Sequence, residues 1–191
     1  DRMSNQSSSG GMIIESNISH AIDNQKLATV TPLTIWLTGL TGAGKSTIAE
    51  ALHQYLKERN IASYTLDGDE LRKGLNNNLS SSPEDRKENV RRTAEVAKLL
   101  NNAGLISIVA LISPYASDRK LAKDIIGKEF IEVFVNTNIE TCRKRDPKGL
   151  YKKADIGEIR EFTGVDAPYE KPENPDVIID TTQINVKTAV G

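Results

Sequence analysis

Apolar and polar residues follow one another in two different rhythms from residue 33 onward. Short runs rich in β-branched and aromatic residues recur there, and longer stretches with apolar residues three or four positions apart separate them. Five short runs have the length and composition of buried strands: Thr34–Thr38, Ala62–Leu66, Ile106–Ile112, Phe130–Val135 and Val177–Ile179. Strands that alternate with helices are typical of an α/β domain. The pattern therefore predicts three layers, with helices on both faces of a five-stranded parallel sheet.

Two of the helical stretches have a clear apolar stripe. The first, residues 47–56, directly follows the first predicted strand. The second, residues 86–102, places Val90 and Ala94 near one stripe, and Gly104 supplies a stop signal. No internal repeat interrupts the alternation, so we expect a single domain over residues 32–191.

The first 31 residues lack this pattern. Residues 1–11 are polar, rich in Ser and Gly and without a period, which indicates a flexible tail or the remnant of an expression tag. Residues 12–31 carry scattered apolar side chains. We expect them to form an arm on the surface of the domain, with Pro32 as the hinge into the first strand.

Composition and charge narrow the class of protein. A length of 191 residues suits one domain, and a formal net charge of −1 gives no reason to expect binding to nucleic acid or to an anionic membrane. The longest apolar runs fall far short of the ~20 residues that span a bilayer, so we expect a soluble protein. The single cysteine, Cys142, excludes an intramolecular disulfide and is expected to be a packing residue. It suits a reducing compartment, and we expect a cytoplasmic location, with an organelle also compatible.

The clearest chemical signal stands between the first predicted strand and the first helical stretch. Eight residues there fit the phosphate-binding pattern G-x-x-x-x-G-K-[ST]: Gly39, Leu40, Thr41, Gly42, Ala43, Gly44, Lys45 and Ser46. Such a loop aims backbone N–H groups at phosphate oxygens, its lysine reaches the β- and γ-phosphates, and its hydroxyl suits Mg²⁺. The alternative is a glycine-rich turn with a chance Lys-Ser pair. The strand and helix on either side favour the nucleotide loop.

Acidic residues follow the second predicted strand. In open parallel sheets, ligands bind beyond the carboxyl ends of the strands, so this position suits chemistry. Asp69 is the candidate base for an attacking hydroxyl, and Asp67 is the candidate ligand of Mg²⁺, directly or through water. We expect Gly68 between them to let a substrate approach closely. The alternative is a helix N-cap with an acidic first turn.

Two further positions suggest binding of an acceptor. Arg86 and Asn89 are three residues apart in a predicted helix, so they share a face and can reach one ligand together. A guanidinium binds phosphate or sulfate bidentately, although a charged run is as often a solvated face. After the third strand, Pro114 fixes a turn that leaves Ser113 facing a ligand. Alternatively, Ser113 caps the next helix and Pro114 is its first residue, and both can hold at once.

The segment after the fourth strand is strongly basic. Six cations lie within residues 143–153, and Pro147 and Gly149 interrupt them. A mobile segment of this kind can close over polyphosphate and exclude water, whereas the alternative is a solvated loop. Further on, Phe162 is either a hydrophobic anchor or a flat surface on which a base stacks.

The motifs together, from Leu33 to about Thr181, resemble the adenylylsulfate kinase family of P-loop kinases. In chain order they read GLTGAGKS, LDGDELRKGLN, PEDRKENVRR, EVAKLLNNAGL, LISPYASDR, IEVFVNT, RDPKGLYKKA and EIREFTGVDAPYEKPENPD. Such enzymes phosphorylate the 3′-hydroxyl of adenosine 5′-phosphosulfate (APS) to give 3′-phosphoadenosine 5′-phosphosulfate (PAPS) in sulfate assimilation. The resemblance implies a nucleotide-kinase-like fold, with ATP and Mg²⁺ as cofactors.

The resemblance also implies a role for individual residues. Residues 39–46 and Arg145 would bind ATP, and Lys45, Asp69 and Ser113 would be catalytic. The APS site would consist of Asp69, Arg72, Arg86, Asn89, Ile112, Ser113, Lys148 and Phe162. In the family, the serine at the position of Ser113 is often described as a phosphoserine intermediate, but in-line transfer to a positioned hydroxyl does not require one.

The chain departs from the family pattern at two positions. Glu70 stands where the family has Asn, and it adds negative charge near an anionic substrate. Ser81 replaces the Phe that normally stacks on the adenine, which is expected to weaken base binding by about 1–3 kcal/mol. A second hypothesis therefore keeps the reaction but changes the acceptor to another nucleotide-linked small molecule, such as a cytidine diphosphate derivative.

A third hypothesis is a weakly active regulatory domain of a bifunctional sulfate-activating protein. The intact set Lys45, Ser46, Asp67 and Asp69 argues against it. The resemblance further implies a homodimer that is fused to ATP sulfurylase or works with it. Members of the family continue into a further helix where this chain has residues 183–191. We expect one of three explanations for this difference: a shortened chain, a disordered tail, or a chain that is one part of a longer protein.

Overall fold

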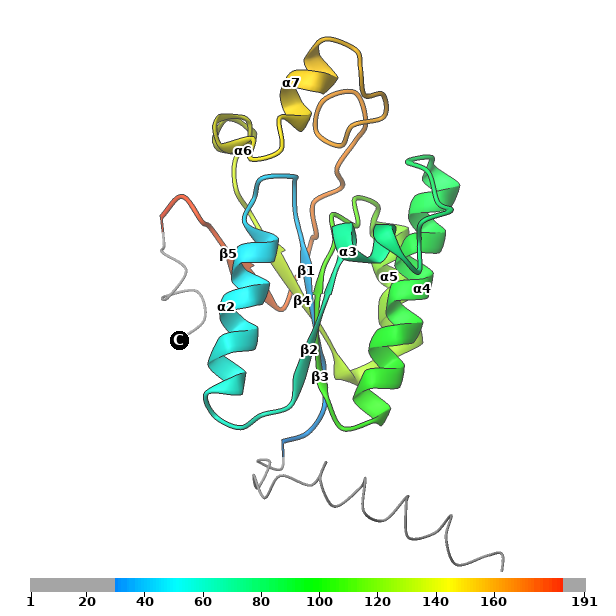
Figure 1. Cartoon of the computed structure of the whole chain (residues 1–191), viewed down its shortest axis with the longest axis vertical. Helices are drawn as coiled ribbons and strands as arrows, with labels where there is room; N and C mark the ends of the chain where they lie inside the picture. The colour runs from blue at the N-terminus through cyan, green and yellow to red at the C-terminus, as the bar shows by residue number, and fades with distance from the viewer. Residues whose placement is uncertain (1–29, 184–191) are drawn as a thin grey trace, which may run out of the picture.

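A parallel sheet runs through the middle of the computed structural model, which describes residues 30–183 (Figure 1). Its strands are β1 (Thr34–Thr38), β2 (Ser63–Asp67), β3 (Ile106–Ala110), β4 (Phe130–Val135) and β5 (Val177–Ile179). They lie in the order β2-β3-β1-β4-β5, and each pairs with its neighbours in parallel. All five predicted strands are confirmed. β3 ends at Ala110, two residues earlier than expected, although the N–H of Leu111 still donates to the carbonyl oxygen of Leu37 at 3.2 Å.

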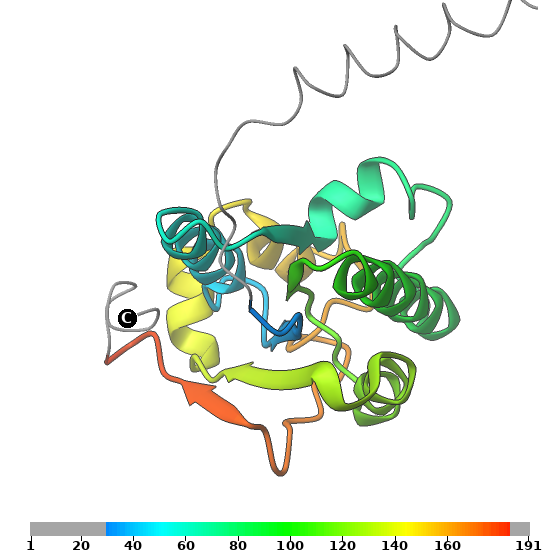
Figure 2. The same ribbon diagram turned by 90° about the horizontal axis from the view of Figure 1, so that it is seen from below.

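Helices cover both faces of the sheet, as predicted. The helices of the described residues are α2 (Lys45–Lys57), α3 (Gly68–Lys73), α4 (Pro83–Asn102), α5 (Ala116–Ile126), α6 (Ile139–Arg145) and α7 (Leu150–Asp155), with a 3₁₀ turn at Gly127–Glu129. Figure 2 shows α2 on one side of the strands and the pair α4 and α5 on the other. No helix of the described part of the chain is both long and apolar enough to cross a membrane.

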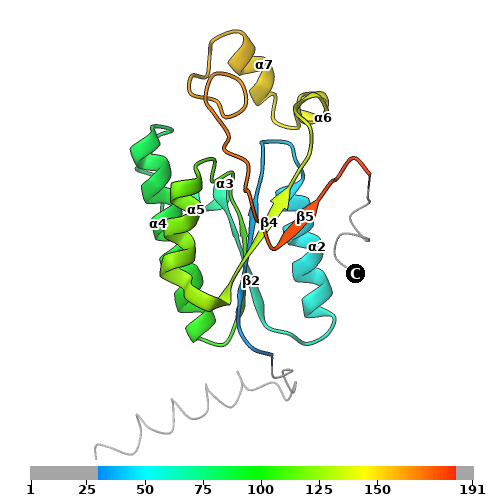
Figure 3. The same cartoon turned by 180° about the vertical axis from the view of Figure 1, so that it is seen from behind.

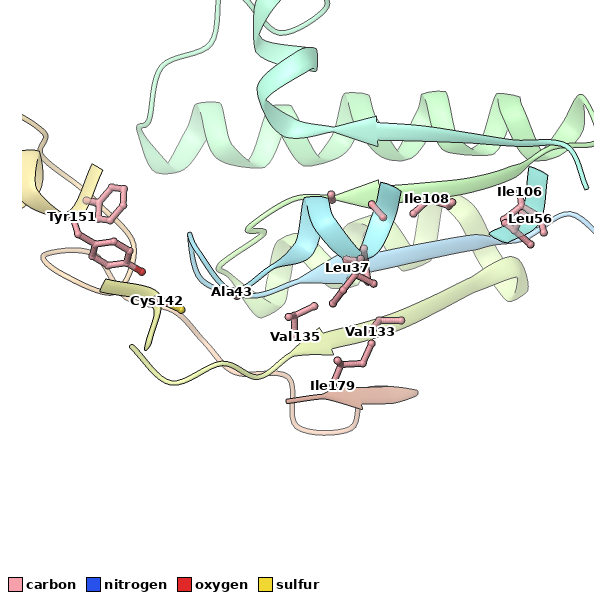
Figure 4. Packing of buried hydrophobic residues seen from close by; sticks show 14 residues of the cluster. Leu37, Ala43, Leu56, Ile106, Ile108, Val133, Val135, Cys142, Tyr151 and Ile179 are labelled. Carbon is pink, nitrogen blue, oxygen red and sulfur yellow. The ribbon is translucent and has the colours of Figure 1, made fainter. Parts of the chain in front are cut away.

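The central strand β1 anchors a separate core on each face of the sheet. Leu37 points toward α2 and packs with Ile108, Val133 and Val135 in the cluster that Figure 4 shows. Trp36 points the other way into a cluster under α4 and α5. Burying one such side chain stabilises the fold by about 1.5–3 kcal/mol. The two clusters hold β1 rigidly, and β1 delivers the phosphate loop.

The long helix α4 begins three residues before its predicted start. Ser82 is the N-cap, its hydroxyl accepts a hydrogen bond from the backbone N–H of Asp85 at 3.2 Å, and Pro83 takes the first helical position. Proline suits that position because its missing N–H would have no helical partner there. At the other end, Gly104 adopts φ 90°, so the predicted stop is confirmed.

The basic segment, residues 143–153, is partly helical, which the sequence analysis did not predict. Its first part ends α6 and its last part forms α7, above the carboxyl ends of the strands (Figure 3). Arg143 forms an ion pair with Asp155 at 2.8 Å, and the carboxylate of Asp146 accepts hydrogen bonds from the N–H groups of Tyr151 and Lys152. These contacts give the segment a helical scaffold. The expected tail, residues 1–11, and residues 12–29 of the expected arm lie outside the described part of the chain. Residues 184–191 lie outside it as well.

Candidate active site

The phosphate loop has the predicted frame of a strand, a glycine-rich turn and a helix. Gly39, Gly42 and Gly44 adopt positive φ values of 152°, 77° and 106°. Residues with a Cβ atom rarely adopt such values, whereas glycine does so readily. A Cβ atom on Gly39 would lie 2.6 Å from the carbonyl oxygen of Val135, and one on Gly42 would lie 2.9 Å from that of Cys142. The glycines are therefore required both by the turn and by its close packing on neighbouring backbone. Cys142 is fully buried, as the sequence predicted for a packing residue.

Lys45 is buried at the start of α2 and folds back over the loop. Its Nζ donates hydrogen bonds to the carbonyl oxygens of Gly39 at 2.9 Å and Leu40 at 2.8 Å. Burial lowers the pKa of this ammonium to about 8, although the charges of Cys142, Asp67 and Asp69 act in the opposite direction. A phosphate group would give the ammonium the anionic partner that its position lacks.

The pKa of Lys45 predicts how ATP binding depends on pH. Phosphate favours the charged lysine, so binding raises its pKa, and above pH 8 the free protein must first take up a proton. We expect affinity for a non-hydrolysable ATP analogue to fall above pH 8, by up to ~10-fold per pH unit. Calorimetric titrations from pH 7 to pH 10 measure this. Lys45→Arg is the control, because guanidinium does not titrate in that range. An affinity that stays flat in the wild type would contradict the prediction.

Ser46 and Asp67 bring two oxygen ligands together beside the loop. The Ser46 hydroxyl donates to Oδ2 of Asp67 at 2.6 Å, and Oδ1 of Asp67 accepts from the N–H of Asp69 at 2.9 Å. The N-cap alternative is thus confirmed for Asp67, which begins α3 and faces the phosphate loop at once. Hydroxyl and carboxylate oxygens are the hard ligands that Mg²⁺ prefers, so the pair fits a magnesium ion beside bound phosphates.

Gly68 packs closely on the chain after β3. A Cβ atom there would lie 2.7 Å from Cδ2 of Leu111, so a larger residue would require the end of that side chain to shift. Gly68 also lines the cavity described below, and the expected close approach of a substrate stays a prediction.

Asp69 and Lys148 meet although they are 79 residues apart in the sequence. Asp69 projects from α3, and Lys148 lies between α6 and α7, so the contact joins the candidate base to the basic segment. Arg145 lies on the donor side, where its guanidinium donates to the hydroxyl of Thr181 at 2.8 Å and to the backbone oxygen of the same residue at 3.0 Å. The basic segment therefore contributes cations to both ends of the site.

The arginines of the acceptor side are partly engaged with backbone. Arg72 donates to the carbonyl oxygens of Leu79 and Ser80 at 2.8 and 3.1 Å. Arg86 donates to the carbonyl oxygens of Ser81 and Glu161 at 2.8 Å each. Both side chains line the cavity described below, so they shape the acceptor side as well as offering positive charge to it.

Ser113 lies in a strained, buried turn after β3. Its φ is 40°, it is 3% exposed, and its hydroxyl oxygen accepts a hydrogen bond from the indole N–H of Trp36 at 3.1 Å. Arg119 donates to its carbonyl oxygen at 2.9 Å. α5 begins at Ala116 with Tyr115 as N-cap, so the alternative that Ser113 caps this helix is wrong. A buried, engaged hydroxyl favours a positioning role over that of a phosphorylated intermediate.

Sequence reasoning missed the residues that hold this turn. Arg119, which donates to the carbonyl oxygen of Ser113, pairs with Glu132 of β4 at 2.8 Å. Trp36 carried the one available signal, because a buried indole N–H needs a partner. Tyr151 was missed as well, and its hydroxyl donates to the carbonyl oxygen of Thr41 at 2.9 Å, which ties α7 to the phosphate loop.

Phe162 belongs to the core, as its anchor alternative predicted. The ring is 7% exposed and meets the ring of Tyr151 edge to face, with centroids 5.0 Å apart. The remaining exposed part still lines the cavity. Phe162 therefore fixes the loop that closes the site and offers only a limited surface for a base.

One cavity of about 840 Å³ joins the two halves of the site. Its lining includes Thr41, Gly42, Gly44, Lys45, Ser46, Asp67, Asp69, Arg72, Ser81, Arg86, Asn89, Ile112, Ser113, Arg145, Lys148 and Phe162. Of the predicted ATP-binding residues, Gly39, Leu40 and Ala43 do not line it. The volume lies near the upper end of the range of ~300–1,000 Å³ for small-molecule sites.

Phosphoryl transfer requires the phosphates of a donor and the hydroxyl of an acceptor to meet in one cavity that can exclude water. This chain provides both halves at the carboxyl end of one parallel sheet. The combination places the protein among the P-loop kinases. The chain belongs to the adenylylsulphate kinase family, whose model matches residues 31–180. As a member of this family it is a kinase that uses ATP and Mg²⁺.

Individual relatives agree with this assignment. The adenylyl-sulfate kinase of Staphylococcus carnosus is 56% identical over 157 residues, which cover 82% of this chain and 79% of the relative. The APS kinase CysC of Mycobacterium tuberculosis, solved in complex with AMPPNP and APS, superposes with a TM-score of 0.82 at 45% identity and covers 84% of this chain and 94% of its own. A hexameric APS kinase from Thiobacillus denitrificans has a TM-score of 0.63 at 32% identity and covers 85% of this chain but 28% of its own.

Proposed function

We propose that this protein transfers the γ-phosphoryl group of ATP to the 3′-hydroxyl of APS, which gives PAPS and ADP. The observation that carries the proposal is the single cavity that joins the phosphate loop to Asp69, Arg86 and Asn89. Membership of the adenylylsulphate kinase family supports the choice of acceptor, as does the relative solved with AMPPNP and APS.

The donor half of the site would hold ATP by its phosphates. Backbone N–H groups of the loop residues that line the cavity would cradle them, and Lys45 would exchange the carbonyl oxygens of Gly39 and Leu40 for the β- and γ-phosphates. Ser46 and Asp67 would hold Mg²⁺, directly or through water, and the ion would neutralise negative charge on the phosphates. Arg145 adds a cation on the same side.

The acceptor half would position and deprotonate the attacking hydroxyl. Asp69 is the candidate general base. Its ion pair with Lys148 must open or shift before the Asp69 carboxylate can accept the proton of the hydroxyl. Arg86 and Asn89 lie side by side on the cavity wall and would bind the anionic part of the acceptor. Ile112 and Ser113 also line the cavity and would shape it through their fixed turn.

The basic segment would keep water away from the transferring group. Tyr151 ties α7 to the phosphate loop through Thr41, and Lys148 crosses to the acceptor side. A cavity closed in this way directs the γ-phosphoryl group to the acceptor rather than to hydrolysis.

The test is ATP turnover with APS, measured beside a panel of other nucleotide-linked acceptors with product detected by phosphate analysis at the 3′ position. Efficient formation of PAPS supports the proposal. Absence of PAPS at saturating APS, with turnover of a different acceptor, would replace APS by that acceptor. Absence of turnover with every acceptor would favour the regulatory domain.

Ser81 is the reason to consider a second acceptor, another nucleotide-linked small molecule. Ser81 is exposed and lines the cavity, at a position where the resemblance implies a Phe that stacks on the adenine of APS. If APS is the acceptor, Ser81→Phe restores a stacking surface and is expected to lower the KM for APS by ~5-fold or more, within the ~1–3 kcal/mol of one base stack. Steady-state kinetics in both substrates measure this. Ser81→Ala is the matched control, because it adds no ring. An unchanged or higher KM in Ser81→Phe would mean that the base is held in another way.

Partners and assembly remain predictions. A homodimer and an association with ATP sulfurylase are what the family resemblance implies, whereas the APS kinase from Thiobacillus denitrificans is described as hexameric. Light scattering of the purified protein decides between these states. A cytoplasmic location is supported by the single, buried cysteine.

A further inference from the structure

The turn between α3 and α4 reverses the usual order of buried and exposed residues. Asn76 is 0% exposed, whereas Leu75 immediately before it is 47% exposed. An apolar side chain would gain more from the buried position, and a buried amide costs free energy unless it is hydrogen-bonded. The arrangement therefore calls for an explanation other than stability.

Asn76 makes one side-chain hydrogen bond among the described residues. Its Nδ2 donates to Oδ1 of Asn89 at 2.8 Å, and its own Oδ1 is buried with no partner there. The backbone of Asn76 is held at both ends, because its N–H donates to the carbonyl oxygen of Leu71 at 2.8 Å and its carbonyl oxygen accepts from the N–H of Leu79 at 3.1 Å. The amide is thus presented to Asn89 by a fixed backbone.

Asn89 is the residue that this bond orients. It is buried in α4 and lines the cavity on the acceptor side. A primary amide has one accepting end and one donating end. Because Asn76 occupies Oδ1, the donating Nδ2 is the end that remains for a ligand. Anionic groups of an acceptor require donors, so this orientation is the productive one.

We propose that Asn76 is a positioning residue, which sets the amide of Asn89 so that Nδ2 faces the acceptor. Asn76 itself does not line the cavity and acts only through Asn89. This inference rests on the proposed function in so far as Asn89 binds the acceptor.

A second contact keeps the turn in place on α4. Arg92 donates to the carbonyl oxygen of Leu75 and to Oδ1 of Asn78, both at 2.9 Å, and its Nε donates to Glu88 at 2.8 Å. The turn that carries Asn76 is therefore docked on the helix that carries Asn89. Docking fixes the distance between the two amides and makes the orientation independent of a bound ligand.

The test uses Asn76→Leu, which keeps the volume but removes the hydrogen bond, and Asn76→Ser, whose hydroxyl is too short to reach Asn89. We expect either variant to raise the KM for APS about 10-fold, the effect of one lost hydrogen bond to a charged group. The KM for ATP should stay within a factor of about two. Asn77→Leu is the matched control, because Asn77 is the exposed neighbour of the same residue type.

A double-mutant cycle separates positioning from general loosening of the structure. In an Asn89→Ala background, Asn76→Leu should change the KM for APS by less than about twofold, because the residue that it orients is gone. The same 10-fold rise in both backgrounds would overturn the proposal, as would a wild-type KM in both Asn76 variants.

A readout without substrate keeps this inference distinct from the proposed function. In ¹⁵N-labelled protein, the side-chain amide resonances of Asn89 should shift in Asn76→Leu or Asn76→Ser and stay in place in Asn77→Leu. If the wild type fails to use APS while these resonances shift, the acceptor is wrong and the orienting contact stands. If they do not shift, the contact is absent and the inference fails whatever the acceptor is.

Discussion

Asp69→Asn is expected to lower kcat for phosphoryl transfer by about 10²- to 10⁴-fold, the range for loss of a general base. The amide has nearly the shape of the carboxylate but cannot accept the proton of the attacking hydroxyl. The KM for ATP should change little, because the proposed ligands of the phosphates are in the phosphate loop, which includes Lys45 and Ser46. Steady-state kinetics with both substrates varied measure the two parameters separately.

Glu70→Gln is the matched control for this variant. Glu70 is the next residue of α3, carries the same charge and pairs with Lys73 on the exposed surface. It should therefore keep a kcat close to that of the wild type. If Asp69→Asn retained most of its activity, another group would accept the proton. If Glu70→Gln lost as much activity as Asp69→Asn, negative charge on α3 would affect the reaction only by long-range electrostatics, and Asp69 would not be the base.

The parts of the fold that the sequence predicted are those determined by short segments. Each strand is a compact run of β-branched and aromatic residues, and the phosphate loop is defined by eight consecutive positions. The start of α4 was predicted three residues too late, because the prediction followed the periodicity of apolar residues. The local signal for the true start is the pair Ser82-Pro83, an N-cap followed by a proline at the first helical position. Periodicity detects the buried face of a helix, and the first turn of α4 contains no buried residue.

The parts that could not be predicted depend on contacts between distant segments. The strained turn at Ser113 is held by Trp36 from β1 and Arg119 from α5, and no local pattern links these three positions. The helices at the two ends of the basic segment were not expected either, and their packing brings Arg143 of α6 to Asp155 of α7. Local charge alone suggested a loop, because the pairing partner of Arg143 lies 12 residues further along the chain.

The site shows the same division. Residue types at the ends of strands identified Asp67, Asp69 and Ser113 as candidates, because the carboxyl edge of a parallel sheet is where ligands bind. That Asp69 meets Lys148, and that Asn89 is oriented by Asn76, follows only from how α3, α4 and the basic segment pack. Sequence therefore indicates which groups can do chemistry, and packing decides which of them meet.

Lys45→Met is expected to lower kcat/KM for ATP by about 10²- to 10³-fold, the effect of removing a preorganised group that stabilises developing charge. It should also stabilise the protein without ATP, because burial lowers the pKa of Lys45 from 10.5 to about 8. A lysine whose pKa falls on folding destabilises the folded state fully below pH 8, and the cost disappears as the pH approaches 10.5. At pH 7 the variant should therefore unfold at a higher Tm than the wild type.

Lys57→Met is the control, since Lys57 is an exposed lysine at the end of the same helix and should change neither kcat/KM nor Tm. Thermal unfolding with and without an ATP analogue completes the test. The analogue should raise the Tm of the wild type much more than that of Lys45→Met, because the variant has lost the cation that the phosphates stabilise. If Lys45→Met had a lower Tm than the wild type but a normal kcat/KM, Lys45 would be a structural residue of the loop and would not bind the phosphates of ATP.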